Sequence, residues 1–475
     1  MTLRFKSFAL ACGVASLIYS PTFAADQAQH KKVQKPVQKT KKTVEAPSSL
    51  ENVKTAISFY SLPDIAIGRP VYTAPFMGGI NSRYDESNLV VHINDINRDL
   101  ILLQQRQKAD DALKAHHLTA PKDPIMSLSG EIQGKILADR DYNGPTESDI
   151  DLSTAKLDAI INIRPWVTGF MTLNYDNTAS SNGARINNSR LYLENGFVTL
   201  GNLNRTPFYM SVGQLYVPFG QYNSSLIATP LTQSIGETNE RAMVFGFKNT
   251  GENTLNVTAY VGKGDIRVGD ENANKINQVG ANAIFAHEGK NFTYQLGAGY
   301  IGNIADAAGM QITGGKGDFT GFGQGAASNE VIKDRVPGVD VQGMIGYGPF
   351  SFVGEYTGAA KRFSPLDMTY DAVGARPRAF HFEGAYQFDL IGHQSSFALA
   401  YGHSYQALAL NLPESRYALT FSSNIVANTV FSMELRHDDN YAEGRTATGQ
   451  GQSTFDTTDL GKSANAATAE ISLYF

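Results

Sequence analysis

The sequence predicts an all-β membrane protein: an antiparallel, up-and-down transmembrane β-barrel of about sixteen strands, preceded by a small N-terminal segment that contains a helix. Three observations predict this fold. Apolar and polar residues alternate with a period of two from Met126 onward. Short and long connectors follow each other between these stretches. The chain also ends on an apolar, strand-like stretch, "ATAEISLYF", whose last residue is Phe475.

Alternation is clear in "MSLSGEIQGKI", "RAFHFEGAYQFDL" and "TVFSMELRHDD". Soluble antiparallel sheets alternate as well, so the connectors decide between the two classes. Tight connectors such as "NTGENT" and "YGPF" take turns with long polar ones, including residues 138–149, 218–241 and 304–335. Short turns at one rim and long loops at the other are typical of an outer-membrane barrel, which we place at residues 126–475.

The last strand is expected to pair with the first, because an open sheet edge in a bilayer would leave backbone groups without hydrogen bonds. Ile471, Leu473 and Phe475 would then face lipid. In outer-membrane barrels generally, a terminal aromatic residue is the recognition signal of the barrel assembly machinery, so we assign that role to these three residues.

Residues 1–24 have the pattern of a secretory signal peptide: Arg4 and Lys6, an apolar run from Phe8 to Ile18, and small residues around Ala24. The apolar run is too short for a membrane-spanning helix. A lipoprotein signal ending at Cys12 would leave almost no hydrophobic region before it. Without Cys12 the mature chain has no cysteine and no disulfides, and its charge is 38 basic minus 45 acidic residues, or -7. Nothing in this composition points to nucleic acid.

Two segments precede the barrel. Residues 25–49 are rich in Lys and Gln and predict a disordered, solvated linker, with contact to peptidoglycan or lipid phosphate as the alternative. Residues 50–120 predict a periplasmic pre-barrel region with a helix near 95–117, in which Ile96, Leu100, Leu103 and Leu113 form an apolar face. We expect this face to pack within its own domain rather than in a coiled coil. The sequence leaves open whether the region plugs the lumen.

Side chains on the polar phase of the strands would line a water-filled lumen. The candidate ligand-contacting residues in this set are Arg190, Glu194, His381, Glu383, Arg416, Glu434 and Arg436. Such a wall can be a row of mutually neutralising ion pairs, for example Arg190 with Glu194 and Glu434 with Arg436, or a constriction that binds a charged solute. Residues 212–242, "VGQLYVPFGQYNSSLIATPLTQSIGETNERA", form either a loop that folds inward and narrows the channel or an extracellular surface loop.

Signals for an enzyme are absent from the sequence. It contains no HExxH or GxSxG motif and no His, Asp and Glu at metal-ligand spacing, so we expect no catalytic residue, metal or cofactor. We interpret His116 and His117 as residues that interact favourably with the C-terminal end of the helix dipole. Ser404 beside His403 is a weak alternative for hydrolysis.

The segment Pro75–Gln107, "PFMGGINSRYDESNLVVHINDINRDLILLQQRQ", together with a signal peptide and a barrel that ends in Phe475, resembles the LbtU family of outer-membrane siderophore porins. The resemblance implies uptake of ferric siderophore across the outer membrane of a Gram-negative bacterium, through a barrel without an energy-coupled plug, and a periplasmic N-terminal region. It assigns no ligand residue, and the oligomeric state stays open.

Two other functions remain. "GQLYVPFGQY" and "ETNERA" faintly resemble phosphate- or anion-selective porins, and a general porin for polar solutes is similar in kind. A structural or adhesive barrel that tethers envelope layers through the Lys/Gln linker is the alternative from another class.

Overall fold

The structure is a computed structural model that describes residues 65–67, 96–115, 117, 124–163, 165–176, 190–269, 275–289, 292–314, 319–323, 330–426, 428–450 and 457–475. The signal peptide and the linker expected at residues 1–49 lie outside the described residues, as do most of residues 50–95.

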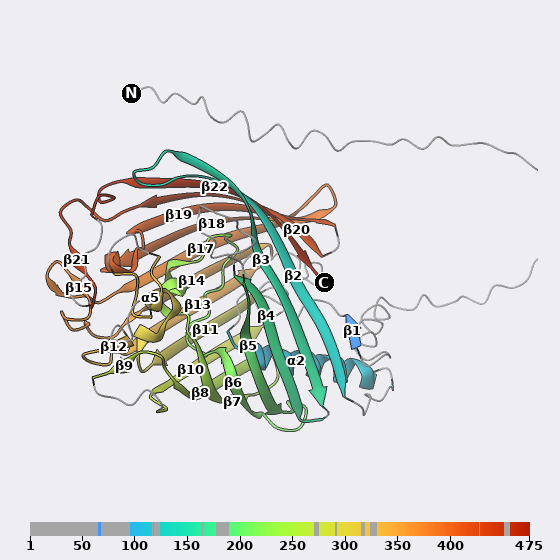
Figure 1. Cartoon of the computed structure of the whole chain (residues 1–475). Coiled ribbons are helices and arrows are strands. Elements are labelled where there is room, and N and C mark those ends of the chain that lie inside the picture. Colours follow the sequence, from blue (N-terminus) through green and yellow to red (C-terminus); the bar gives the residue numbers. More distant parts are fainter. Residues whose placement is uncertain are drawn as a thin grey trace, which may run out of the picture. The chain divides into compact units, whose positions relative to one another are not determined.

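A closed antiparallel barrel is the body of the molecule (Figure 1). The main sheet has 17 strands, of which β1 (Ile65–Ile67) pairs in parallel with the start of β2, and the other sixteen form the barrel in chain order. This confirms the predicted fold class. The barrel strands are β2 (Ile125–Arg140), β3 (Thr146–Ile163), β4 (Val167–Asp176), β5 (Arg190–Gly201), β6 (Phe208–Tyr216), β7 (Asn239–Lys248), β8 (Asn253–Lys263), β10 (Gln278–Glu288), β11 (Phe292–Ile301), β13 (Gly338–Tyr347), β14 (Phe350–Ala359), β17 (Arg378–Leu390), β18 (His393–Tyr405), β19 (Ser415–Val426), β20 (Thr429–Asp439) and β22 (Ser463–Tyr474).

The barrel closes where β22 pairs with β2, from Glu131 opposite Tyr474 to Arg140 opposite Asn465. Phe475 extends this ladder, because its N–H donates to the Gly130 carbonyl at 3.0 Å and its carbonyl accepts from the Gly130 N–H at 2.8 Å. A Cβ atom at position 130 would lie 2.5 Å from the Phe475 ring and 2.6 Å from the Lys156 carbonyl, so only glycine fits here. On the outward face, Ile471 and Leu473 are exposed, as predicted for lipid-facing residues.

The connectors sort into two rims. Only residues 348–349 separate β13 from β14, whereas residues 302–337 separate β11 from β13. We call the two ends of the barrel the short-turn rim and the long-loop rim. One expectation was wrong: residues 138–149 are not a long loop, because β2 and β3 have 16 and 18 residues and only residues 141–145 lie between them. A two-stranded ladder satisfies its own backbone hydrogen bonds, so it can continue beyond the rim with polar side chains.

The long loops fold together into a compact cap. Within it, β15 (Thr369–Tyr370), β16 (Val373–Gly374) and β21 (Ala447–Thr448) form a small sheet, and β9 (Arg267–Val268) pairs with β12 (Val331–Ile332). The cap also holds η3 (Ile304–Asp306), α5 (Ala308–Gln311) and η5 (Leu408–Leu410). Its shared apolar core contains fully buried side chains from several loops, including Ile266, Ile304, Phe322, Phe363 and Leu408.

Helix α2 (Arg98–Ala115) precedes the barrel and lies within the range expected for a helix. Its sequence, RDLILLQQRQKADDALKA, is rich in good helix formers, with Asp99 in the first turn and Lys114 in the last, where each charge complements the helix dipole. Figure 1 shows α2 at the end of the barrel where β2 begins and β22 ends.

Candidate functional site

The two faces of the barrel wall have opposite chemistry. Along β8, Thr254, Asn256 and Thr258 alternate with Leu255 and Val257. Thr258 is 1% exposed and Val257 is 41% exposed, so the polar phase faces inward and the apolar phase faces outward. Elsewhere on the outer face, Leu399 is 64% exposed.

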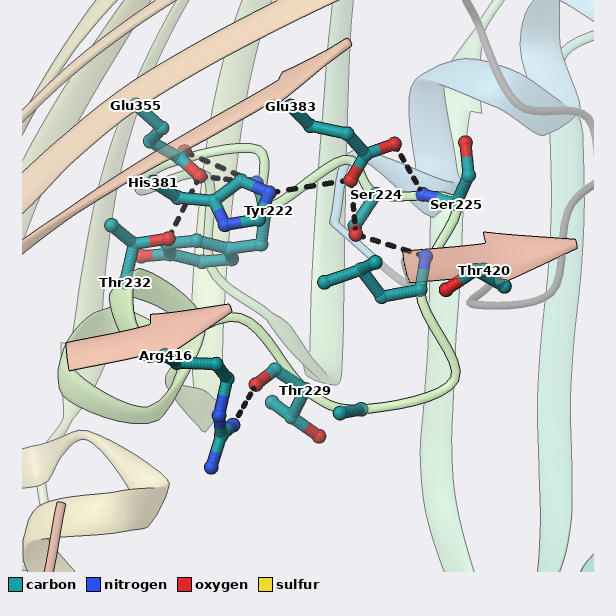
Figure 2. Close-up of polar contacts among 12 residues, drawn as sticks. Tyr222, Ser224, Ser225, Thr229, Thr232, Glu355, His381, Glu383, Arg416 and Thr420 are labelled. Atoms are coloured by element: carbon teal, nitrogen blue, oxygen red, sulfur yellow. Dashed lines mark hydrogen bonds and ion pairs between the residues drawn. The ribbon is translucent and has the colours of Figure 1, made fainter. Parts of the chain in front are cut away.

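Residues 217–238, between β6 and β7, fold into the lumen, and we call them the constriction loop. Figure 2 shows the loop held against wall residues from β14, β17 and β19. Of the two alternatives that the sequence left open, the structure has the inward fold. The loop contains α4 (Leu231–Gly236), whose residues Leu231 and Ile235 are fully buried.

Three wall carboxylates hold the loop through its backbone. Glu355 on β14 accepts hydrogen bonds from the N–H of Gln221 at 2.8 Å and from that of Tyr222 at 3.0 and 3.1 Å. It also accepts a bond from the Thr232 hydroxyl at 3.3 Å. Burial raises the pKa of the Tyr222 phenol well above its usual range, so this ring stays neutral.

Glu383 on β17 is the second anchor. It accepts from the Ser224 hydroxyl at 2.6 Å and from the Ser225 N–H at 2.8 Å. The Nε2 atom of His381 lies 3.3 Å from the same carboxylate. Both side chains are buried, so these two lumen candidates face the loop instead of open solvent (Figure 2).

The third anchor is Glu434 on β20, which accepts from the N–H of Ile227 at 2.6 Å and from that of Ala228 at 3.2 Å. Next to it, the Arg416 Nη1 atom donates to the Thr229 carbonyl at 2.9 Å. Charged acceptors make hydrogen bonds about twice as strong as neutral ones, so three carboxylates fix this loop firmly.

Arg416 and Arg436 share one carboxylate at the long-loop end of the wall. Arg416 donates to Asp438 through Nε at 2.8 Å and Nη2 at 2.9 Å, and the Nε atom of Arg436 lies 3.2 Å from Asp438. Two guanidinium groups and one carboxylate leave one net positive charge. The Arg436 side chain is 33% exposed, so this charge is accessible to solvent.

The remaining predicted residues lie on β5. Glu194 pairs with Lys156 at 3.3 Å and accepts from the Tyr216 hydroxyl at 2.9 Å. Arg190 is exposed at the long-loop end of the strand. The ion pairs suggested by strand spacing are therefore replaced by others, since Glu194 pairs with Lys156 and Arg436 with Asp438. Contact of any of these residues with a solute stays a prediction.

The structure brings some predicted residues together and leaves others apart. Arg416, Glu434 and Arg436 lie on the adjacent strands β19 and β20, while β5 is adjacent to neither. The alternation along the strands did not predict that Asp438 binds both arginines or that the loop backbone binds the wall carboxylates. No local sequence signal could have found these contacts, because the partners are up to 207 residues apart.

A buried polar cluster joins the cap to the barrel. The Asp306 carboxylate on η3 accepts from the Ile266 N–H at 2.7 Å and from Gln278 Nε2 at 2.9 Å. Gln278 also donates to Glu240 at 3.3 Å. Burial, the largest cause, raises the pKa of Asp306 to about 7, with Asp265 also raising it and Arg335 lowering it.

The described residues contain no group of three or more His, Cys, Asp or Glu side chains placed to hold a metal ion. None of the helices in the described ranges is long and apolar enough to cross a membrane.

Fold and site together define a class: a sixteen-stranded β-barrel with an apolar outer face, a polar lumen and an inward-folded loop held by wall carboxylates. The chain belongs to the UPF0422 protein family. It is 34% identical to the UPF0422 protein of Coxiella burnetii over 394 residues, which cover 82% of this chain and 81% of that protein. It is also 34% identical to a UPF0422 protein of Legionella pneumophila over 434 residues, covering 88% and 81%. No family model matches the chain.

Solved structures with a similar fold are outer-membrane porins and channels. The anion-selective porin of Comamonas acidovorans has a TM-score of 0.47 at 10% identity, with coverage of 74% of this chain and 100% of that one. The channel DcaP of Acinetobacter baumannii has a TM-score of 0.45 at 12% identity, with coverage of 75% and 99%. These scores and identities assign no solute to this chain. The relatives do not carry the LbtU name either, so that resemblance stays a prediction.

Proposed function

We propose that this protein is an outer-membrane channel that lets small polar solutes diffuse through its lumen. The observation that carries the proposal is the opposite polarity of the two faces of one closed barrel. A ring of exposed apolar side chains suits hydrocarbon, and every strand pairs on both sides, so no backbone group meets lipid without a hydrogen bond. Sixteen strands leave room for an aqueous path.

The constriction loop makes the path selective. Its backbone is fixed to Glu355, Glu383 and Glu434, so it narrows the lumen permanently instead of moving with each solute. The charge of the wall beside the loop then matters, because fields are strong where water is scarce. There the carboxylates of Glu355, Glu383 and Glu434 are occupied by donors of the loop, whereas the partly exposed cluster of Arg416, Asp438 and Arg436 has one net positive charge of its own.

Ferric siderophore is the cargo that we propose, following the resemblance of the pre-barrel segment to siderophore porins. The arginine cluster supports an anionic, carboxylate-bearing complex, since guanidinium groups bind carboxylates with paired hydrogen bonds. The same cluster also favours the second candidate, a phosphate- or anion-selective porin. In both cases the solute would move by facilitated diffusion.

Single-channel recording in planar bilayers tests the channel itself. Discrete conductance steps are expected, and a sealed lumen would leave only the structural, tethering function. Uptake of labelled ferric siderophore by cells with and without the gene, grown under iron limitation, then tests the cargo. Equal uptake in both strains, alongside slower phosphate uptake in the knockout, would replace siderophore by phosphate.

A further inference from the structure

An apolar patch on the lumen wall is unexpected in a water-filled channel. Ile160 on β3, Phe170 on β4 and Phe197 on β5 lie on the inward phase of their strands and are 3–4% exposed. Tyr209 on β6 continues the patch and is also buried. Apolar surface facing water costs about 25 cal/mol per Å², so such a patch implies a cover.

Helix α2 is that cover. Leu100 and Leu103 pack with Leu203 and Tyr209, and Leu102 joins the cluster that contains Ile160, Phe170 and Phe197. Gly201, at the end of β5, permits this approach, because a Cβ atom there would lie 3.1 Å from Leu103 and 2.8 Å from the Cβ of Tyr209. The apolar face predicted for the helix therefore packs on the inner wall of the barrel, and not within a separate pre-barrel domain as expected.

Polar contacts fix the helix in one register. Arg106 donates to the Thr168 hydroxyl at 2.7 Å and to the Gly201 carbonyl, and the Ser211 hydroxyl donates to Asp99 at 2.6 Å. The Arg98 guanidinium lies 5.7 Å from the centroid of the Phe170 ring. Asp99 and Arg106 are buried. These bonds reach β4, β5 and β6, so the helix is held by three adjacent strands of the wall.

The docked helix lies near the short-turn rim. Gln107 Nε2 donates to Asn204 at 3.3 Å, and Asn204 belongs to the turn between β5 and β6. The constriction loop, by contrast, starts where β6 ends, at the other rim. The two elements therefore fill the lumen from opposite ends.

We propose that α2 is a second constriction: an intramolecular plug that narrows the lumen at the short-turn rim and helps to set the size limit and conductance of the channel. This inference rests on the proposed channel function. It assigns α2 a role in solute selection that the constriction loop does not already provide. Arg98 and Arg106 lie at that level of the lumen together with the Asp99 carboxylate.

The test undocks the helix without touching the barrel. Leu102→Asp with Leu103→Asp places two charges against the apolar patch, whereas Lys108→Gln with Lys114→Gln makes the same change of net charge at exposed positions of the same helix and is the matched control. Heat-modifiable migration on gels verifies that each barrel is folded. The leucine variant should show a higher single-channel conductance and pass larger neutral solutes, and the lysine control should behave like the wild type in size limit.

A cross-link should reverse the change. Asp99→Cys and Ser211→Cys, added to the leucine variant and joined by a short thiol cross-linker, should restore the lower conductance, because the helix is again held at β6. An unchanged conductance and size limit in the folded leucine variant would overturn the inference.

A second measurement does not depend on transport. Thr199 is buried beside Ser211, so a cysteine at 199 should react slowly with a water-soluble thiol reagent in the wild type and faster in the leucine variant. If no variant conducts but this labelling changes, the channel function fails while the docking of α2 stands. Equal labelling in both would overturn the docking itself.

Discussion

The carboxylate of Glu434 lies 2.6 Å from the backbone nitrogen of Ile227, a residue 207 positions earlier in the chain. Strand phase predicted Glu434 as a residue that faces the solute. In the structure its oxygens accept bonds from the constriction loop and from Thr420. A charge on the lumen wall thus shapes the channel indirectly, by holding the loop that narrows it.

Replacing Glu434 with Ala should loosen the constriction loop. The N–H groups of Ile227 and Ala228 would lose their acceptor, at a cost of about 1–3 kcal/mol to the docked loop. Channel conductance should rise and become noisier, and protease should cleave within residues 217–238 faster. Glu252→Ala, at an exposed short turn, is the control and should change neither. Equal protease resistance in the two variants would remove Glu434 as an anchor.

Arg436→Ala should make the channel less favourable to anions. The variant leaves Asp438 paired with Arg416 alone, so the net positive charge of the cluster falls to zero. The reversal potential in a salt gradient should shift toward cation selectivity, and uptake of an anionic solute should fall. Arg205→Ala, in the turn between β5 and β6, is the charge-matched control. The same shift in both variants would show that only total charge matters.

Gly130→Ala should impair closure of the barrel. The added methyl group would lie 2.5 Å from the Phe475 ring and 2.6 Å from a backbone carbonyl, at the seam between the first and last strands. Less folded protein should reach the membrane, measured by heat-modifiable migration. Gly134→Ala, on the same strand with open space at its Cβ, is the matched control. Deleting Phe475 should have an effect similar to that of Gly130→Ala.

Packing of η3 against the barrel should weaken as the pH rises. The pKa of Asp306 is raised from 3.8 to about 7, so the stability that this group contributes is complete below pH 3.8 and is lost as the pH rises through about 7. Hydrogen exchange of residues 303–311 should therefore speed up, beyond its intrinsic pH dependence, between pH 5 and pH 8. Asp306→Asn cannot ionise and should abolish that excess. A persistent excess in this variant would point to Glu240 instead.

Much of the fold follows from the sequence because the period of two is a local property. The alternation of apolar and polar residues depends only on the environment at each face of a strand. Hydrocarbon outside and water inside give the same alternation on every strand. The ends of β2 and β3 were not predicted, because both faces of this hairpin meet water beyond the rim. There the alternation of apolar and polar residues no longer indicates where a strand ends.

The site was harder to predict for a different reason. His381, Glu383, Arg416 and Glu434 were assigned to the lumen wall from strand phase, and they do face inward. The loop that Glu383, Arg416 and Glu434 bind, however, lies more than 150 residues away in the chain, and no local pattern in either segment predicts these contacts. The apolar face of α2 was likewise evident in the sequence, whereas the surface that it covers was not.

The sequence by itself determined the sixteen-stranded barrel, its polarity and its closure at Phe475, because these depend on nearest neighbours along a strand and on the two solvents. Only the tertiary structure decided that the wall carboxylates hold the constriction loop and that α2 lies against β3–β6. Those contacts join segments distant in the chain, and their energies exist only once the closed barrel has brought the partners within hydrogen-bonding distance.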